Sequence, residues 1–173
     1  MMKNYIKNIL IRYNLLHVVT LSKSQLFINF IFQRIFLINS ECNTSIHFTS
    51  KVSGYKNIII KGSNKLPVIT SMAMSGGCYF NVFEGTTLEI GEGTIWSYNV
   101  CIQTGNHDFI DRSKYNLKNV KIGSNCWIAH AVTIVAGVEL GDNVIVGANS
   151  VVTKSFPSNV VIGGVPAKLI REI

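Results

Sequence analysis

The sequence predicts a mainly β fold in which short strands wind into stacked, three-sided coils. An aliphatic residue recurs at every sixth position along one stretch: Ile122, Ile128, Ile134, Leu140, Val146 and Val152. Small or β-branched residues follow the first five by four positions: Cys126, Val132, Val138, Val144 and Ser150. A period of six matches neither a helix nor a plain alternating strand. It indicates a solenoid in which three hexads form a coil of about 18 residues, with neighbouring strands ~4.8 Å apart.

The same step occurs twice more upstream. A clear block contains Ile90, Trp96 and Ile102, and a faint one contains Ile46, Val52 and Ile58. The residues directly after the aliphatic positions are mostly tiny: Gly123, Ala129, Val135, Gly141 and Gly147. We interpret them as corner residues, whose small side chains relieve the steric cost of unusual backbone angles. A sandwich of short strands with turns about 8–12 residues apart is the alternative, and the uninterrupted six-residue phase disfavours it.

Two domains are expected, the first being a helical cap over residues 1–40. Five apolar residues approximate one helical face: Ile6, Ile9, Leu10, Tyr13 and Leu16. Such a cap would cover the open end of the solenoid. The alternative for residues 1–38 is a peripheral contact with anionic membrane, because no acidic residue precedes Glu41.

Residues 41–173 are expected to form the solenoid domain. Residues 41–77 form a first, irregular coil with a loop around Gly62–Pro67. Residues 104–119 break the hexad phase and are more polar than their flanks, which predicts a protruding binding loop. The phase returns at Ile122, ends near Ser155 and leads into a short closing segment, residues 167–173.

The composition limits the class of partner and the compartment. Hydrophobic residues make up 47% of the chain and charged residues 14%, so a subunit interface is expected to cover part of the surface. A net charge of +7 favours an anionic partner, such as nucleic acid, anionic lipid or a phosphorylated cofactor. The cysteines show no metal-ligand spacing and favour a reduced compartment: Cys42, Cys78, Cys101 and Cys126. The longest apolar run, Leu26–Ile38, is shorter than the ~18 residues of a membrane span. We therefore expect a cytoplasmic protein, at most peripheral at the inner membrane face.

His107 is the candidate general base. It lies in Thr104-Gly105-Asn106-His107-Asp108-Phe109, where the repeat opens into the loop. An imidazole suits removal of a proton from a hydroxyl that attacks a thioester. Its second ring nitrogen needs an orienting carboxylate or backbone carbonyl, and Asp108 and Asp111 are the nearby carboxylates. A surface loop histidine without a catalytic role is the alternative.

The hexad repeat and the His107 motif make residues 78–173 resemble the hexapeptide-repeat acyltransferases. Within that family, they are most similar to the branch that contains the galactoside, maltose and polysaccharide O-acetyltransferases. The resemblance implies a left-handed parallel β-helix, a homotrimer and a metal-free transfer of acetyl from acetyl-CoA to a sugar or polysaccharide-precursor hydroxyl. It implies that His107 is the base and that the His130 backbone N–H holds the oxyanion. It places acceptor contacts at Asn81 and Asp108.

The same resemblance implies a coenzyme A site, with contacts from Trp127, Ala148, Thr153, Lys154, Lys168 and Arg171. The cations suit the pyrophosphate and ribose phosphate of that molecule. Asn149 stands where relatives commonly have Gly, and Lys168 where they often have Arg. Trp127 precedes an inward Ile, so its side chain is expected to face outward, with subunit packing as the alternative role.

Two other functions remain at this stage. A zinc lyase resembling the γ-type carbonic anhydrases would draw ligands from His107 and His130, but a third histidine at matching spacing is missing from the sequence. A non-catalytic scaffold would leave the His107 motif and the C-terminal cations Lys154, Lys168 and Arg171 unexplained. We expect no metal and no nucleic acid partner.

Overall fold

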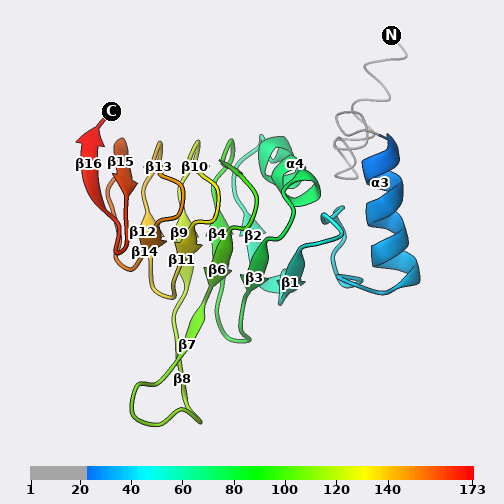
Figure 1. Ribbon diagram of the computed structural model, residues 1–173, viewed down its shortest axis with the longest axis horizontal. Coiled ribbons are helices and arrows are strands. Elements are labelled where there is room, and N and C mark those ends of the chain that lie inside the picture. The colour runs from blue at the N-terminus through cyan, green and yellow to red at the C-terminus, as the bar shows by residue number, and fades with distance from the viewer. Residues whose placement is uncertain (1–22) are drawn as a thin grey trace.

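The computed structural model describes residues 23–173 and confirms a mainly β fold (Figure 1). The helical part of the chain is short: α3 (Lys23–Phe30), the π-helix η1 (Ile31–Ile35), the 3-10 helix η2 (Tyr55–Asn57) and α4 (Leu66–Met74). The first half of the predicted cap, residues 1–22, lies outside the described residues. The division into domains at residue 40 stays a prediction.

Three sheets hold all but two of the described strands. Sheet A contains β1 (Lys51–Ser53), β3 (Tyr79–Asn81), β6 (Cys101–Gln103), β11 (Thr133–Ile134) and β14 (Val151–Val152). Sheet B contains β2 (Ile58–Ile60), β4 (Leu88–Ile90), β9 (Val120–Ile122) and β12 (Glu139–Leu140). Sheet C contains β5 (Ile95–Trp96), β10 (Trp127–Ile128), β13 (Ile145–Val146), β15 (Val160–Gly163) and β16 (Lys168–Glu172). The remaining two, β7 (Gly105–His107) and β8 (Tyr115–Leu117), form an antiparallel hairpin.

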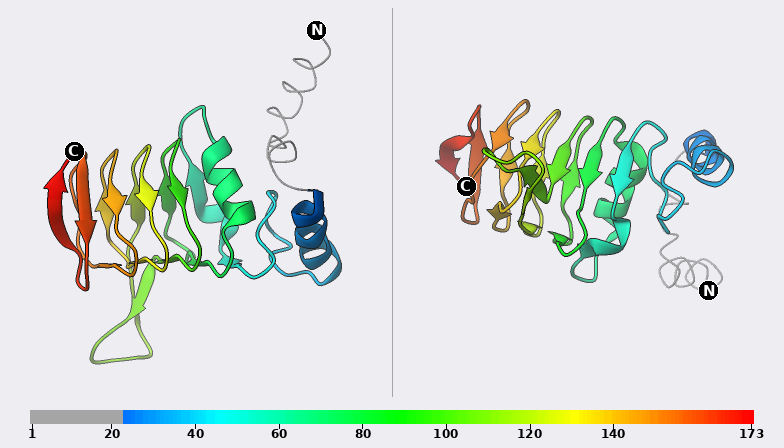
Figure 2. Two further views of the ribbon diagram at one scale, coloured as in Figure 1. Left: turned by 45° about the horizontal axis from the view of Figure 1, so that its top comes forward. Right: turned by 90° about the horizontal axis from the view of Figure 1, so that it is seen from below.

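From β4 to β14 the chain visits the sheets in the rotation B, C, A, leaving aside the hairpin between β6 and β9. Strand partners in this region are parallel, and the later ones lie 18 residues apart, as in Trp127↔Ile145 and Thr133↔Val151. That separation is three hexads, as the sequence period predicts. The result is a stack of short strands with the C-terminal pair β15–β16 at one end and α3 at the other (Figures 1 and 2).

The hexad positions form the core. All six aliphatic residues from Ile122 to Val152 are at most 4% exposed, and their partners four positions on, from Cys126 to Ser150, are at most 1% exposed. Burial of this regular series of apolar side chains supplies the main driving force for the coil. The prediction of inward and outward positions is confirmed for this block and for Ile90, Trp96 and Ile102.

The interpretation of the corner glycines was wrong. The left-handed backbone conformation occurs two residues later, at Asn125, Ala131, Gly137, Asn143 and Asn149, whose φ angles lie between 55° and 86°. Asn tolerates this conformation better than most residues, which explains Asn125, Asn143 and Asn149 at three of these positions. Gly123 is small for another reason: a Cβ there would lie 2.4 Å from the backbone of Gly141 in the next coil. Close stacking of successive coils excludes the side chain.

The prediction of a loop around Gly62–Pro67 was wrong at its C-terminal end, because α4 begins at Leu66. Pro67 lies in the first turn, where its missing N–H costs nothing and its fixed φ favours a helix. The helix buries Val68, Met72 and Ala73. It packs against β5, at the point where sheet C ends while sheets A and B continue by one more strand. Helix α4 thus covers the side of the first coil that lacks a strand (Figure 2).

None of the helices in the described part of the chain combines the length and apolar character needed to cross a bilayer.

Candidate functional site

The β7–β8 hairpin carries His107 and projects from the stack beyond the end of β6 (Figure 1). Its base is fixed by Thr104, which is fully buried. The Thr104 hydroxyl accepts a hydrogen bond from the Phe83 N–H at 2.9 Å and lies 2.6 Å from the Thr86 hydroxyl. The backbone of Thr104 also bonds to Asn81 and Lys118 on either side. A protruding segment at residues 104–119 therefore begins from a rigid anchor.

The imidazole of His107 is oriented within the hairpin. Its Nδ1 lies 2.8 Å from the Arg112 carbonyl oxygen. Because a carbonyl only accepts, Nδ1 carries the proton and Nε2 is left as the acceptor of a neutral ring. The Tyr115 ring, paired with His107 across the hairpin, lies 4.5 Å from the imidazole centroid. The side chain is exposed, so Nε2 is accessible to a substrate.

Two carboxylates shape the loop between the strands. Asp108 accepts hydrogen bonds from the Asp111 and Ile110 N–H groups and from the Asn116 amide. These bonds, the Asp111 N–H first, lower the pKa of Asp108. The Ser113 hydroxyl is the main cause of the lowered pKa of Asp111. The partner of His107 is thus a backbone carbonyl, and both aspartates instead fold the loop that presents that carbonyl.

A cleft lies at the foot of the hairpin and brings two predicted residues together. Its lining includes His107 and Asn81, and also Tyr79, Gln103 and Tyr115, which sequence reasoning missed. Asn81 and Gln103 are direct partners in sheet A, so both amides face the same side. The six-residue period did not identify Gln103, because 22 residues separate it from Asn81, whereas three hexads span 18. Tyr115 depends on a hairpin register that the sequence does not display.

Trp127 and Arg171 lie in sheet C. The cross-strand register aligns Trp127 with Ile145, Ile145 with Val161, and Val161 with Arg171. Trp127 is 50% exposed, which confirms the outward orientation. Lys168 begins the last strand, β16, and is exposed together with Arg171. Sheet C therefore presents an aromatic ring and two cations along one surface.

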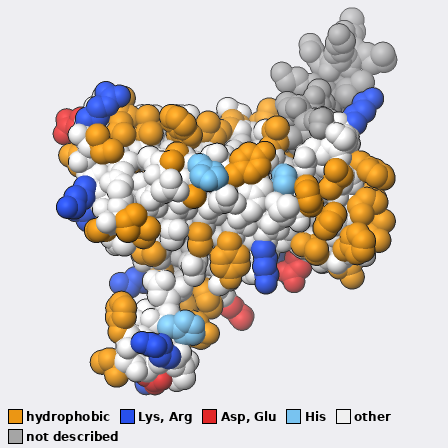
Figure 3. All heavy atoms as spheres, in the orientation of Figure 1, with side chains coloured by type: hydrophobic (Ala, Val, Ile, Leu, Met, Phe, Trp, Pro, Cys, Tyr) orange, Lys and Arg blue, Asp and Glu red, His pale blue; other side chains and the backbone are white. Residues whose placement is uncertain are grey.

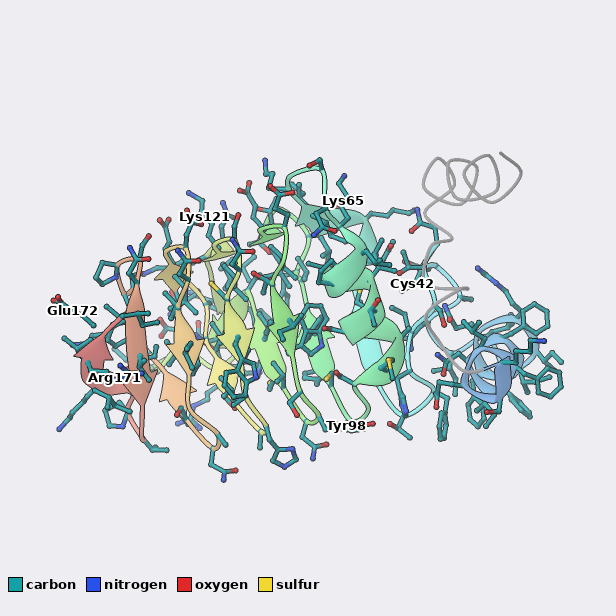
Figure 4. All side chains as sticks on the ribbon, turned by 90° about the horizontal axis from the view of Figure 1, so that it is seen from above. Cys42, Lys65, Tyr98, Lys121, Arg171 and Glu172 are labelled. Carbon is teal, nitrogen blue, oxygen red and sulfur yellow. The ribbon has the colours of Figure 1, made fainter. Side chains whose placement is uncertain are left out.

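His130 and Ala148 lie at the turns that lead from sheet C to sheet A. The Asn149 N–H donates to the His130 carbonyl at 2.9 Å, which stacks the two turns. The His130 backbone N–H donates to no acceptor among residues 23–173. Tyr98 belongs to the same row of turns, because the Ala131 N–H donates to its carbonyl. In Figure 4 Tyr98 lies on the side of the stack opposite Lys121 of sheet B.

Thr153 and Lys154 follow β14, where sheet A ends, and both are exposed. The Lys154 ammonium lies 5.5 Å from the centre of the Phe156 ring. Within the described residues no hydrogen bond or ion pair links Lys154, Lys168 or Arg171 to His107. The predicted residues are thus spread over sheets A and C and the turns at their ends. Sheet B instead carries alternating charges, with ion pairs Lys61–Glu89 and Lys121–Glu139.

In residues 23–173, no cluster of three or more His, Cys, Asp or Glu side chains is arranged to hold a metal ion.

Comparison with known proteins defines the class. Residues 119–154 match the family model of the bacterial transferase hexapeptide (six repeats). The putative colanic acid biosynthesis acetyltransferase WcaF of Escherichia coli is 38% identical over 124 residues, which cover 68% of this chain and 67% of the relative. The E. coli galactoside O-acetyltransferase is 38% identical over 96 residues, covering 53% of this chain and 47% of the relative. The chain belongs to the hexapeptide-repeat acyltransferase family.

Solved structures agree with this assignment. A maltose O-acetyltransferase from Clostridium difficile 630 has a TM-score of 0.51 and 32% identity, covering 73% of this chain and 60% of that one. A hexapeptide-repeat acetyltransferase from Vibrio cholerae, at 24% identity, shares the fold with a TM-score of 0.52 over 86% of this chain and 85% of its own. The chain spans about half to two thirds of the length of WcaF, the galactoside O-acetyltransferase and the maltose O-acetyltransferase.

Proposed function

We propose that this protein is an acetyl-CoA-dependent O-acetyltransferase that acts on a hydroxyl of a sugar or polysaccharide precursor, with His107 as general base. The observation that carries the proposal is the His107–Arg112 contact of 2.8 Å, which leaves Nε2 as a proton acceptor at the cleft that Asn81 lines. The similar proteins are named as a galactoside O-acetyltransferase, a maltose O-acetyltransferase and a putative colanic acid biosynthesis acetyltransferase, and these names support a sugar acceptor.

The reaction needs one proton acceptor and one oxyanion donor. Nε2 of His107 takes the proton of the acceptor hydroxyl as its oxygen attacks the thioester carbon. The carbonyl oxygen becomes an oxyanion, for which the unpaired His130 N–H is the proposed donor. Collapse of the tetrahedral intermediate breaks the C–S bond, and the thiolate of coenzyme A takes the proton from the imidazolium. No covalent enzyme intermediate and no metal take part in these steps.

Coenzyme A is proposed to bind along sheet C, the turns that lead from sheet C to sheet A, and the segment that follows β14. Lys154, Lys168 and Arg171 supply cations for its phosphates. Trp127, Ala148 and Thr153 are proposed to contact its remaining parts, and exposure of all six side chains agrees with this role. Lys168 offers a single ammonium, so it contacts a phosphate as a point charge rather than through two parallel bonds.

The three sheets are proposed to be the faces of a left-handed parallel β-helix, and the active unit a homotrimer. Two observations favour a trimer. His107 lies on a hairpin at sheet A, whereas Trp127 and Arg171 lie on sheet C of the same chain. A neighbouring copy would bring its sheet C against that hairpin and complete the site. The charged sheet B is suited to face solvent.

Asn81 is proposed to contact the acceptor directly, since it lines the cleft. Asp108 is proposed to contribute to acceptor binding by holding the loop, because its carboxylate oxygens accept hydrogen bonds from that loop. A cytoplasmic location, where acetyl-CoA is made, is part of the same proposal.

The test is release of free thiol from acetyl-CoA by the purified protein across a panel of neutral sugars, sugar nucleotides, serine and antibiotics. The proposal predicts turnover with a hydroxyl-bearing sugar and a raised KM for Asn81→Ala. Absence of coenzyme A binding would indicate a scaffold, and zinc at one equivalent per chain with carbonic anhydrase activity would indicate a lyase. Either result would reject the proposal.

A further inference from the structure

The N-terminal helical segment is inverted: it buries amides and exposes large apolar side chains. Within α3 and η1 the buried residues are Asn29 and Gln33, which are 0% and 4% exposed. Seven large apolar side chains of residues 27–38 are 38–67% exposed: Phe27, Ile28, Phe30, Ile35, Phe36, Leu37 and Ile38. We call these seven the N-terminal apolar patch. An ordinary surface helix turns its apolar stripe inward.

Hydrogen bonds fix this orientation. The Gln33 amide donates to the Thr44 carbonyl at 3.0 Å and accepts from the Ile46 N–H at 2.8 Å. The Asn29 amide donates to the Ala73 carbonyl at 3.0 Å. These amides satisfy backbone groups at the end of the stack that no strand pairs, and breaking such buried bonds is costly. The helix cannot rotate to bury its phenylalanines without breaking these hydrogen bonds.

The patch lies at one end of the molecule, away from the hairpin, and Figure 3 shows hydrophobic side chains gathered there. Exposed apolar clusters of this kind mark contact surfaces. The surrounding charge is basic on balance, because Lys23 and Arg34 are exposed and Glu41 is the one acidic residue within residues 23–50. The patch therefore combines apolar side chains with positive charge.

We propose that the N-terminal apolar patch is a membrane-contact surface that inserts its side chains into the interface of an anionic lipid bilayer. A bilayer accepts apolar side chains without shape complementarity, and its anionic headgroups match the basic surround. A second copy of the chain packed end to end would instead bring two surfaces of the same positive charge together. The inference is independent of the acetyltransferase reaction, since α3 contributes nothing to the cleft.

The experiment is flotation of the full-length protein with vesicles of phosphatidylcholine alone and with about 30% phosphatidylglycerol. The wild type should float with the anionic vesicles and bind less to the neutral ones. The double variant Phe27→Ser, Phe30→Ser should bind at least about tenfold more weakly, because two inserted aromatic rings are lost. Both side chains are more than half exposed, at 65% and 56%, so its melting temperature should stay that of the wild type.

A matched control uses the two most exposed large apolar residues outside the patch within residues 23–173. Phe109 and Ile110, at the hairpin loop, are 92% and 96% exposed. The variant Phe109→Ser, Ile110→Ser should float as the wild type does, which separates patch-specific binding from general stickiness. Three outcomes would each overturn the proposal. The wild type does not float, or both double variants lose flotation equally. The third is that the patch variant dissociates an oligomer that the wild type forms, without any change in flotation.

Discussion

Substitution of Gly123 by Ala tests how closely the coils stack. A Cβ at this position would lie 2.4 Å from the Gly141 carbonyl carbon and oxygen and 2.6 Å from the Asp142 carboxylate. Contacts this short do not occur in proteins, and two of the three atoms belong to backbone that is paired in the next coil. The coils must therefore separate locally. We expect Gly123→Ala to destabilise the protein by about 1–3 kcal/mol, the usual cost of overpacking.

Gly147 provides the matched control, because it occupies the same position of a hexad. Its nearest atom would be the Ile162 carbonyl oxygen at 3.5 Å, an ordinary contact. Gly147→Ala should change stability by less than about 1 kcal/mol, with the sign favouring the folded state, since Ala lowers the entropy of the unfolded chain. Urea unfolding of both variants measures the difference. Equal stability of the two variants would refute the stacking argument.

Three further predictions concern the hairpin and the thiols. Thr104→Val should lower stability by about 1–3 kcal/mol and reduce acetyl transfer, because the Phe83 N–H loses its acceptor; urea unfolding and thiol release measure the two effects. Alkylation of the native protein at pH 8 should label the half-buried Cys101 before Cys42, because burial raises the pKa of the Cys42 thiol to about 12. Mass spectrometry gives the order of labelling, and labelling of Cys42 before Cys101 would contradict the prediction. Loop hydrogen bonds lower the pKa of Asp108, so its contribution to loop order should be complete above pH 3.8 and disappear as pH falls through the lowered value. NMR signals of Tyr115 should report this change, and Asp108→Asn should reduce the pH dependence to the part that Asp111 contributes.

The sequence predicted the buried positions and the 18-residue strand spacing well, because its period is a direct record of which side chains face inward. It failed at the corners, where two different constraints act on neighbouring residues. Coil spacing excludes a side chain at Gly123, whereas backbone conformation selects Asn125 two positions later. A period alone does not separate close approach from a left-handed turn. Helix α4 was missed because nine residues, LPVITSMAM, are too few and too apolar to show a helical stripe.

The roles of the site residues stay predictions. A motif singled out His107 and a loose family match singled out Asn81, and both side chains line one cleft. The partner of the His107 Nδ1 could not be predicted, because any residue at position 112 supplies the same backbone carbonyl. Tyr115 depends on a hairpin register set by the carboxylates of Asp108 and Asp111. The inverted burial of Asn29 is likewise set by backbone groups far along the chain.

Turnover of His107→Ala, measured as thiol release beside calorimetric binding of coenzyme A, tests the central claim most directly. Loss of the base should reduce the rate by about 10²–10⁴-fold, while the affinity for coenzyme A remains that of the wild type. A variant that keeps the full rate of acetyl transfer would show that the oriented imidazole of the hairpin is not the base.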